Sequence, residues 1–113
     1  MFGFSNDIPF GKLLDQEVAW VCFAIREAAI KVRSGDEIII YNMDEFLSRN
    51  AIADSEGPNL LLSLRESKIT DITIASGAAL KIEFEGFGVL WFHDRINDFE
   101  NFCFVVGGKE YIV

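Results

Sequence analysis

The sequence predicts a mainly β protein: two repeated three-strand antiparallel meanders plus a C-terminal hairpin, with one short connecting helix. Short runs rich in Val, Ile, Phe and Thr are bounded by turn residues throughout the chain. The first half repeats in the second, and the tail places Gly107-Gly108 between two apolar runs. Eight short strands are expected to form either a barrel-like sheet or two packed sheets, because both arrangements bury strand edges.

The internal repeat is clearest in two short sequence segments, EAAIKV beginning at Glu27 and GAALKIEF beginning at Gly77. Residues 13–42 align with residues 64–93 around one compensated single-residue gap. Leu13 then falls on Leu64, and the apolar positions that follow match in order. We interpret this as an internal duplication inside one domain that spans residues 1–113.

Each unit of the repeat predicts three strands. The first strands are 17–25 and 68–75, the second are 28–32 and 78–84, and the third are 36–42 and 87–93. In the second strand, Ile30 and Val32 alternate with Lys31 and Arg33, which predicts one buried and one solvated face. The third strands are apolar on both faces, which favours a central position or a face covered by another element.

The segment between the meanders, residues 43–67, predicts the connecting helix. Pro58 is expected at the first helical position, and the helix would carry Leu60, Leu61, Leu62 and Leu64 against the sheet. Residues 43–50 can add another helical turn. The glycines of SGDE and EGFG fit the tight hairpins that join the second and third strands.

Composition places the chain among packed globular domains. Half of the 113 residues are apolar and eleven are Phe, so a hydrophobic core that needs no disulfide or metal to stabilise it is expected. No apolar stretch reaches the length of a membrane span, and the N-terminus lacks the features of a secretory signal, which favours the cytoplasm. Cys22 and Cys103 lie inside apolar runs and are predicted to be buried, reduced thiols.

The net charge of −8 limits the classes of partner. An acidic surface repels the phosphate backbone of nucleic acids and anionic membranes, so neither is expected to bind. The charge suits solubility, and it also suits electrostatic steering toward a basic protein partner.

No catalytic motif is found in the sequence. The only imidazole is His93, and there is no P-loop, nucleophile elbow or dinucleotide fingerprint. The densest polar cluster contains His93, Asp94, Asp98 and Glu100, but its spacing matches no calcium or zinc motif, and a solvated acidic loop is expected. The protein is therefore predicted to be no enzyme and to need no metal or cofactor.

The predicted protein-binding surface consists of acidic residues and one tryptophan as an anchor. The acidic residues flank the first unit's third strand or lie in the segment between the meanders. The predicted partner-binding residues are Trp20, Asp36, Glu37, Asp44, Glu45, Asp54 and Glu56. Trp20 aligns with Asp71 in the repeat and is expected on the outer face, whereas Trp91 aligns with Ile40 and is expected in the core. The alternative is that these carboxylates form only a solvated rim of loops.

The stretches Leu64 to Ile69 and Ala79 to Phe84, then Gly86 and the end of the chain from Asp98, resemble small uncharacterised bacterial β-proteins encoded beside polymorphic toxins. Several of these act as immunity proteins, including those of contact-dependent growth inhibition. The resemblance implies a non-catalytic cytosolic protein that binds and neutralises a cognate toxin domain, basic and nuclease-like. It assigns no site residues. Two other hypotheses remain open: a small-ligand-binding β-barrel with a Phe-lined interior, and a structural homodimer that pairs apolar faces or edge strands.

Overall fold

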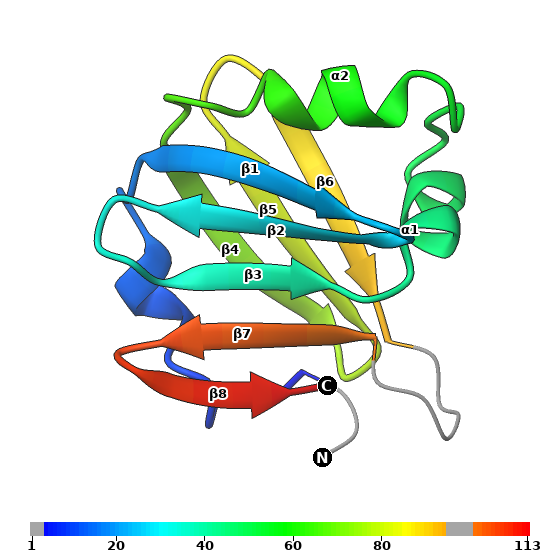
Figure 1. Cartoon of the computed structure of the whole chain (residues 1–113). Coiled ribbons are helices and arrows are strands. Elements are labelled where there is room, and N and C mark those ends of the chain that lie inside the picture. Colours follow the sequence, from blue (N-terminus) through cyan, green and yellow to red (C-terminus); the bar gives the residue numbers. More distant parts are fainter. Residues whose placement is uncertain (1–3, 95–100) are drawn as a thin grey trace.

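The computed structural model describes residues 4–94 and 101–113, and it consists of two antiparallel sheets packed face to face (Figure 1). The larger sheet has the strand order β1-β2-β3-β7-β8, and the smaller has the order β4-β5-β6. The larger sheet contains β1 (Val18–Ala24), β2 (Glu27–Val32), β3 (Glu37–Ile40), β7 (Phe102–Val106) and β8 (Lys109–Ile112). The smaller contains β4 (Ile69–Ser76), β5 (Ala79–Phe84) and β6 (Gly88–His93). Of the two predicted arrangements, the fold is therefore the two packed sheets.

Both predicted meanders and the terminal hairpin are confirmed. Strands β1, β2 and β3 form consecutive antiparallel pairs, as do β4, β5 and β6. The β7–β8 hairpin extends the larger sheet by pairing β7 with β3. Gly35, Gly107 and Gly108 have φ values of 97°, 63° and 82°, a region that glycine enters without steric cost. These glycines therefore allow the tight turns that the sequence predicts.

The connector contains two short helices (Figure 1): α1 (Met43–Arg49), where a further helical turn was predicted, and α2 (Gly57–Leu62), the predicted connecting helix. A further 3-10 helix, η1 (Phe10–Leu13), precedes β1. Pro58 is the second residue of α2 rather than its first, because Gly57 already has helical geometry. A Cβ at Gly57 would lie 2.6 Å from Leu47 Cδ1, so a larger residue there would require the Leu47 side chain of α1 to move. Among the described residues, no helix is long and apolar enough to cross a membrane.

The two sheets are joined at one corner by main-chain hydrogen bonds. The Val18 N–H donates to the Ser67 carbonyl at 2.8 Å, and the Glu66 N–H donates to the Val18 carbonyl at 2.8 Å. The Ile69 N–H also donates to the Gln16 carbonyl at 2.9 Å. The beginnings of β1 and β4 therefore pair, and from this corner the sheets diverge around the core.

The core between the sheets is rich in aromatic rings. Phe92 of β6 lies with its ring centroid 5.1 Å from Phe46 of α1, 5.2 Å from Phe102 and 6.3 Å from Phe104. The inward residues predicted for β5, among them Leu80, are fully buried, while the alternate residues face outward. Aromatic pairs at these separations pack favourably edge-on or tilted, so one interlocked cluster links both sheets and α1.

The third strands of the two meanders have different environments. As predicted for a strand apolar on both faces, β3 is central, between β2 and β7. By contrast, β6 is an edge strand of the smaller sheet. In the repeat, Ile38 falls on Val89, but Ile38 is buried and Val89 is exposed, so the burial of the third strands is out of phase with that alignment.

Four predictions of burial are wrong. Leu60 and Leu62 were expected against the sheet but are exposed, because among the leucines of α2 only Leu61 is buried. Trp91 was expected in the core, but it is half-buried, because it lies between the inward-facing Leu90 and Phe92 and so faces the opposite side of the sheet. Cys22 was expected to be buried but is exposed, because β1 is an edge strand and Cys22 faces outward. Cys103 is buried, as predicted.

A matched pair of Leu→Ala substitutions tests this core. Leu80→Ala removes a fully buried side chain and is expected to lower the free energy of unfolding by about 2–5 kcal/mol. Leu62→Ala makes the same chemical change at a side chain that is 40% exposed, and it should cost less than about 1 kcal/mol. Urea denaturation measures both, and equal losses in the two variants would contradict the assignment of the core.

Candidate binding surfaces

The predicted acidic surface is divided between the two ends of β3 (Figure 1). Asp36 and Glu37 lie at the beginning of β3, next to the β2–β3 turn. Asp44 and Glu45 lie in the first turn of α1, just beyond the other end of the strand. Asp54 and Glu56 follow in the loop between α1 and α2. The structure therefore brings Asp36 and Glu37 together at one end of β3, while the other four residues belong to the connecting segment at the other end.

Asp36 and Glu37 are both engaged within the larger sheet. The Gly107 N–H donates to Asp36 Oδ1 at 3.0 Å, so Asp36 ties the β2–β3 turn to the β7–β8 turn. Glu37 is half-buried, and in the sheet register it lies between Lys31 of β2 and Val105 of β7. These positions give both residues a local structural role.

The four carboxylates of the connecting segment, which we call the acidic connector, are Asp44, Glu45, Asp54 and Glu56. Asp44 lies 3.8 Å from Arg26, and Glu45 lies 3.4 Å from Arg49 one helical turn away. Exposed ion pairs of this kind add little stability, although they offset part of the negative charge. Asp54 and Glu56 are exposed, and within the described part of the chain neither forms an ion pair.

Trp20 lies on the outer face of the larger sheet, as the sequence predicts. Its side chain is 51% exposed, and Lys31 Nζ lies 5.2 Å from the ring centroid, in a cation–π contact. Near the beginning of β1, Arg33, which follows β2, donates a hydrogen bond from Nη2 to Glu17 Oε1 at 2.9 Å. This hydrogen bond raises the pKa of Arg33 above its ordinary value. Trp20 is therefore accessible for contact with a partner.

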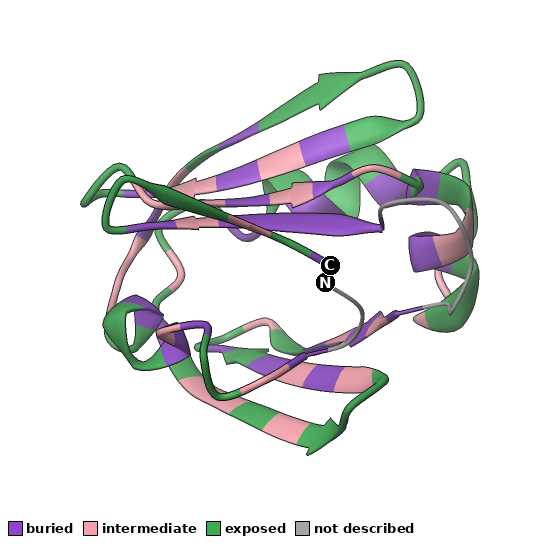
Figure 2. Ribbon diagram, turned by 90° about the horizontal axis from the view of Figure 1, so that it is seen from below, coloured by how far each residue is buried: buried purple, intermediate pink, exposed green. Residues whose placement is uncertain are grey.

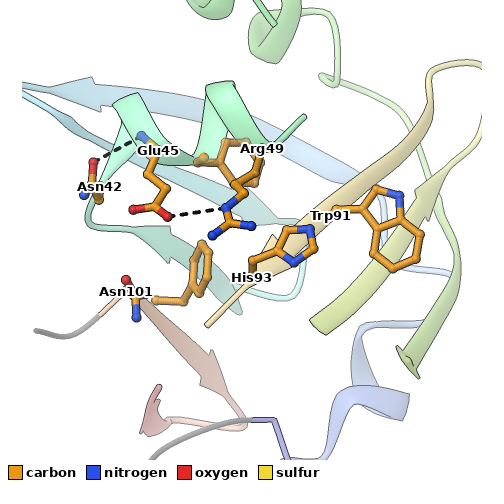
Figure 3. A pocket seen from close by; sticks show the side chains of 8 residues that line it. Asn42, Glu45, Arg49, Trp91, His93 and Asn101 are labelled. Atoms are coloured by element: carbon orange, nitrogen blue, oxygen red, sulfur yellow. Dashed lines mark hydrogen bonds and ion pairs between the residues drawn. The ribbon is translucent and has the colours of Figure 1, made fainter. Parts of the chain in front are cut away.

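A small polar depression lies where α1, β6 and the beginning of β7 meet (Figure 3). It is lined by Asn42, Glu45, Phe46, Arg49, Trp91, His93, Asn101 and Phe102. Its free volume is about 10 Å³, which is the space of a single water molecule. His93 is stacked on Trp91, with ring centroids 6.1 Å apart. The depression has no room for a substrate or cofactor.

The polar cluster predicted around His93 differs from a solvated loop where the structure describes it. Asp94 is buried, and Asn101 Nδ2 donates to Asp94 Oδ1 at 2.8 Å. The Asn101 amide thus supplies a hydrogen bond that water would make to an exposed carboxylate. Asp98 and Glu100 lie outside the described residues. Among the described residues, no group of three or more His, Cys, Asp or Glu side chains could hold a metal ion.

Asn50, at the end of α1, covers the edge of β6 and was not identified from the sequence. Its Nδ2 donates to the Trp91 carbonyl at 2.9 Å, and its Oδ1 accepts from the Trp91 N–H at 2.7 Å. One side-chain amide thus substitutes for a neighbouring strand at this point of the edge. The only signal in the sequence is an asparagine at a helix end, which is common and does not reveal its partner.

Exposed apolar side chains gather along β1 and α2, which contact each other. The described residues include eight exposed large apolar side chains, and five of them lie on β1, on its turn or on α2: Trp20, Phe23, Ile25, Leu60 and Leu62. An open groove of about 160 Å³ lies beside the β1–β2 hairpin, lined mainly by apolar residues that include Cys22, Phe23 and Ile39. Of these side chains, the sequence predicted only Trp20 to be an exposed contact. Phe23 and Ile25 were missed because the run WVCFAI is also typical of a buried strand. Leu60 and Leu62 were missed because the helix was expected to pack all of its leucines on the sheet.

Comparisons with known proteins do not assign the chain to a family. No family model, curated protein or solved structure matches it. The resemblance to immunity proteins therefore stays a prediction from the sequence pattern, and the functional argument depends on the surfaces described above.

The role of Asn50 is testable with a paired substitution. Asn50→Ala leaves the Trp91 N–H and carbonyl at a partly buried edge without their side-chain partner, and it should cost about 1–3 kcal/mol of unfolding free energy. Asn59→Ala makes the same change at an exposed position of α2 and should be close to neutral. Urea denaturation followed by tryptophan fluorescence distinguishes the two, and equal stabilities would remove Asn50 from this role.

Proposed function

We propose that this chain is a non-catalytic, cytosolic immunity protein that binds and neutralises a basic, nuclease-like bacterial toxin domain. The observation that carries the proposal is the acidic connector of a protein with a net charge of −8, in which Asp54 and Glu56 are exposed and without ion pairs among the described residues. Such a surface is complementary to a domain that has to attract a polyanion.

Electrostatics explains how binding would neutralise such a toxin. A nuclease holds the phosphate backbone with Lys and Arg, so its substrate site is a basic cleft. Carboxylates placed over that cleft compete with phosphate for the same cations and keep the substrate out. The opposite charges of the two proteins also accelerate their encounter, an effect that weakens as salt is raised.

Within this proposal, we assign the contact to those predicted residues that are exposed. Asp44, Asp54 and Glu56 of the acidic connector are exposed and would face the toxin. Trp20 remains a candidate anchor, since large amphipathic rings dominate the energetics of many interfaces. Asp36 and Glu37 contribute less, because one accepts a main-chain hydrogen bond and the other is half-buried.

The ligand-binding barrel is a weaker alternative. Such a protein needs an open apolar interior, whereas here the space between the sheets is occupied by Phe rings whose centroids lie 5.0–6.4 Å apart. The groove beside β1 and β2 is open to solvent and small for a ligand.

The first experiment is a tagged pull-down at low salt from the native host, with the neighbouring genes intact. We expect recovery of one basic domain encoded next to this chain, and its release when the salt concentration is raised. Growth of cells that express that domain should be restored by co-expression of this chain. A preparation that recovers no basic partner at low salt would count against the proposal.

Charge reversal in the acidic connector tests the contact itself. Asp54→Lys combined with Glu56→Lys should slow association with the captured domain by about tenfold or more at low salt, and should flatten its salt dependence. Glu83→Lys combined with Glu85→Lys makes the same change in net charge at exposed positions on the smaller sheet and is the matched control. Stopped-flow association rates give the answer: if both double variants slow equally, only net charge matters and the assigned surface is wrong.

A further inference from the structure

The edges of the two sheets are protected to different degrees. The strands β1, β8, β4 and β6 each lie at an edge. The side chain of Asn50 is hydrogen-bonded to the edge of β6. The other two edge strands carry charged residues that disfavour pairing, Lys109 and Glu110 on β8 and Asp71 on β4. Strand β1 (VAWVCFA) has no charge and no proline, the features that usually stop an edge from pairing with another chain.

The unpaired part of β1 is a short stretch centred on Cys22. At its beginning, both main-chain groups of Val18 are taken by Ser67 and Glu66. From Ala19 to Ile25, no main-chain hydrogen bond to a residue outside the β1–β2 pair is found among the described residues. Figure 2 shows that the tip of the β1–β2 hairpin splays away from the smaller sheet. Helix α2 contacts β1, but Cys22, Phe23 and Ala24 toward the tip are exposed. Cys22 lies midway between Ala19 and Ile25.

We propose that β1 pairs with β1 of a second copy of this chain, antiparallel, about a twofold axis at Cys22. The five strands of each copy then form one continuous sheet of ten strands. This inference goes beyond the proposed function and does not depend on it, because the partner is a second copy and the contact is the main-chain edge of β1 rather than the acidic connector. Trp20 is the one residue that both proposals use.

The hydrogen-bonding pattern of β1 supports this register. A two-residue turn, Ile25 and Arg26, links Ala24 to Glu27, so Ala24 and Glu27 form a hydrogen-bonded pair. Alternation along the antiparallel ladder then directs the N–H and C=O of Val21 and Phe23 to the open edge. With the axis at Cys22, Val21 of each copy meets Phe23 of the other, and every outward group in this stretch gains a partner.

Charge and apolar burial also favour a second copy over other occupants. Two chains that each carry −8 repel in general, but no like charges oppose each other along an uncharged strand. The pairing runs from Ala19 to Ile25 and ends before Val18, whose main-chain groups are already bound to Ser67 and Glu66. The pairing covers Phe23, which is 41% exposed, and places Trp20 beside Ala24 of the second copy.

Cys22 makes the register directly measurable. The two Cys22 residues would form a non-hydrogen-bonded cross-strand pair, whose Cα atoms lie about 4.5 Å apart. A disulfide accepts Cα separations of about 4.4–6.8 Å, so mild oxidation should link the two copies. Cys103 is buried and serves as an internal control.

The experiment combines native mass with oxidation of the whole chain. Sedimentation velocity should give twice the chain mass of 12.7 kDa at micromolar concentration, and copper-phenanthroline should produce a covalent dimer that Cys22→Ser abolishes. Cys22→Lys places two ammonium groups opposite each other, and it should shift the native mass to that of a monomer. Ile112→Lys, which introduces the same charge on the exposed face of β8, should remain dimeric.

A control variant is needed for disulfides that form by random collision of exposed thiols, and it carries its exposed cysteine away from β1. Ser55→Cys in the Cys22→Ser background presents an exposed thiol on the connector, and it should crosslink at least about tenfold more slowly than Cys22. A monomeric mass at all concentrations overturns the proposal. It is also overturned by a dimer that survives Cys22→Lys, or by equal crosslinking rates at positions 22 and 55.

Discussion

The structure depends on how the main-chain groups at the edges of two small sheets are satisfied. In a sheet of three strands, two of the strands are edge strands with unpaired main-chain groups. What covers these edges therefore matters as much as how the central strand is packed. At one corner, Val18, Ile69 and their neighbours join the sheets by hydrogen bonds, and at β6 the Asn50 amide takes the place of a strand. These two devices fix the smaller sheet against the larger one and hold α1 in its place.

The aromatic core follows from that arrangement. Because α1 is anchored to β6 through Asn50, its residue Phe46 is brought against Phe92, and Phe102 packs beside both. The rings cross the space between the sheets, which leaves no open barrel interior. The same packing explains why the polar depression near His93 is so small, since Phe46 and Phe102 form its floor with charged and amide groups around them.

The two candidate binding surfaces are parts of the molecule that the fold leaves uncovered. One is polar, the acidic connector, and suits a basic protein partner reached by electrostatic attraction. The other is apolar, the edge of β1, and suits a main-chain partner of the same kind as β1 itself. They lie on different elements, so binding of a toxin domain and pairing of two copies are separate hypotheses that the structure supports by separate observations.

The sequence by itself determined the strands, their alternation and their turns, because these depend on near neighbours. Ile30 and Val32 face inward with Lys31 outward, and the Gly107-Gly108 turn forms a hairpin, both as expected from local pattern. Trp20 is exposed, as expected from its alignment with Asp71 in the repeat. The acidic residues were also recognised, but not their division between the two ends of β3. Tertiary structure alone decided which strands are edges, and therefore that Cys22 is exposed and Trp91 lies outside the core. It also decided the partner of Asn50, which is 41 residues away in the chain. An edge is defined by the absence of a neighbour in space, and an apolar run has the same composition whether that neighbour is present or not.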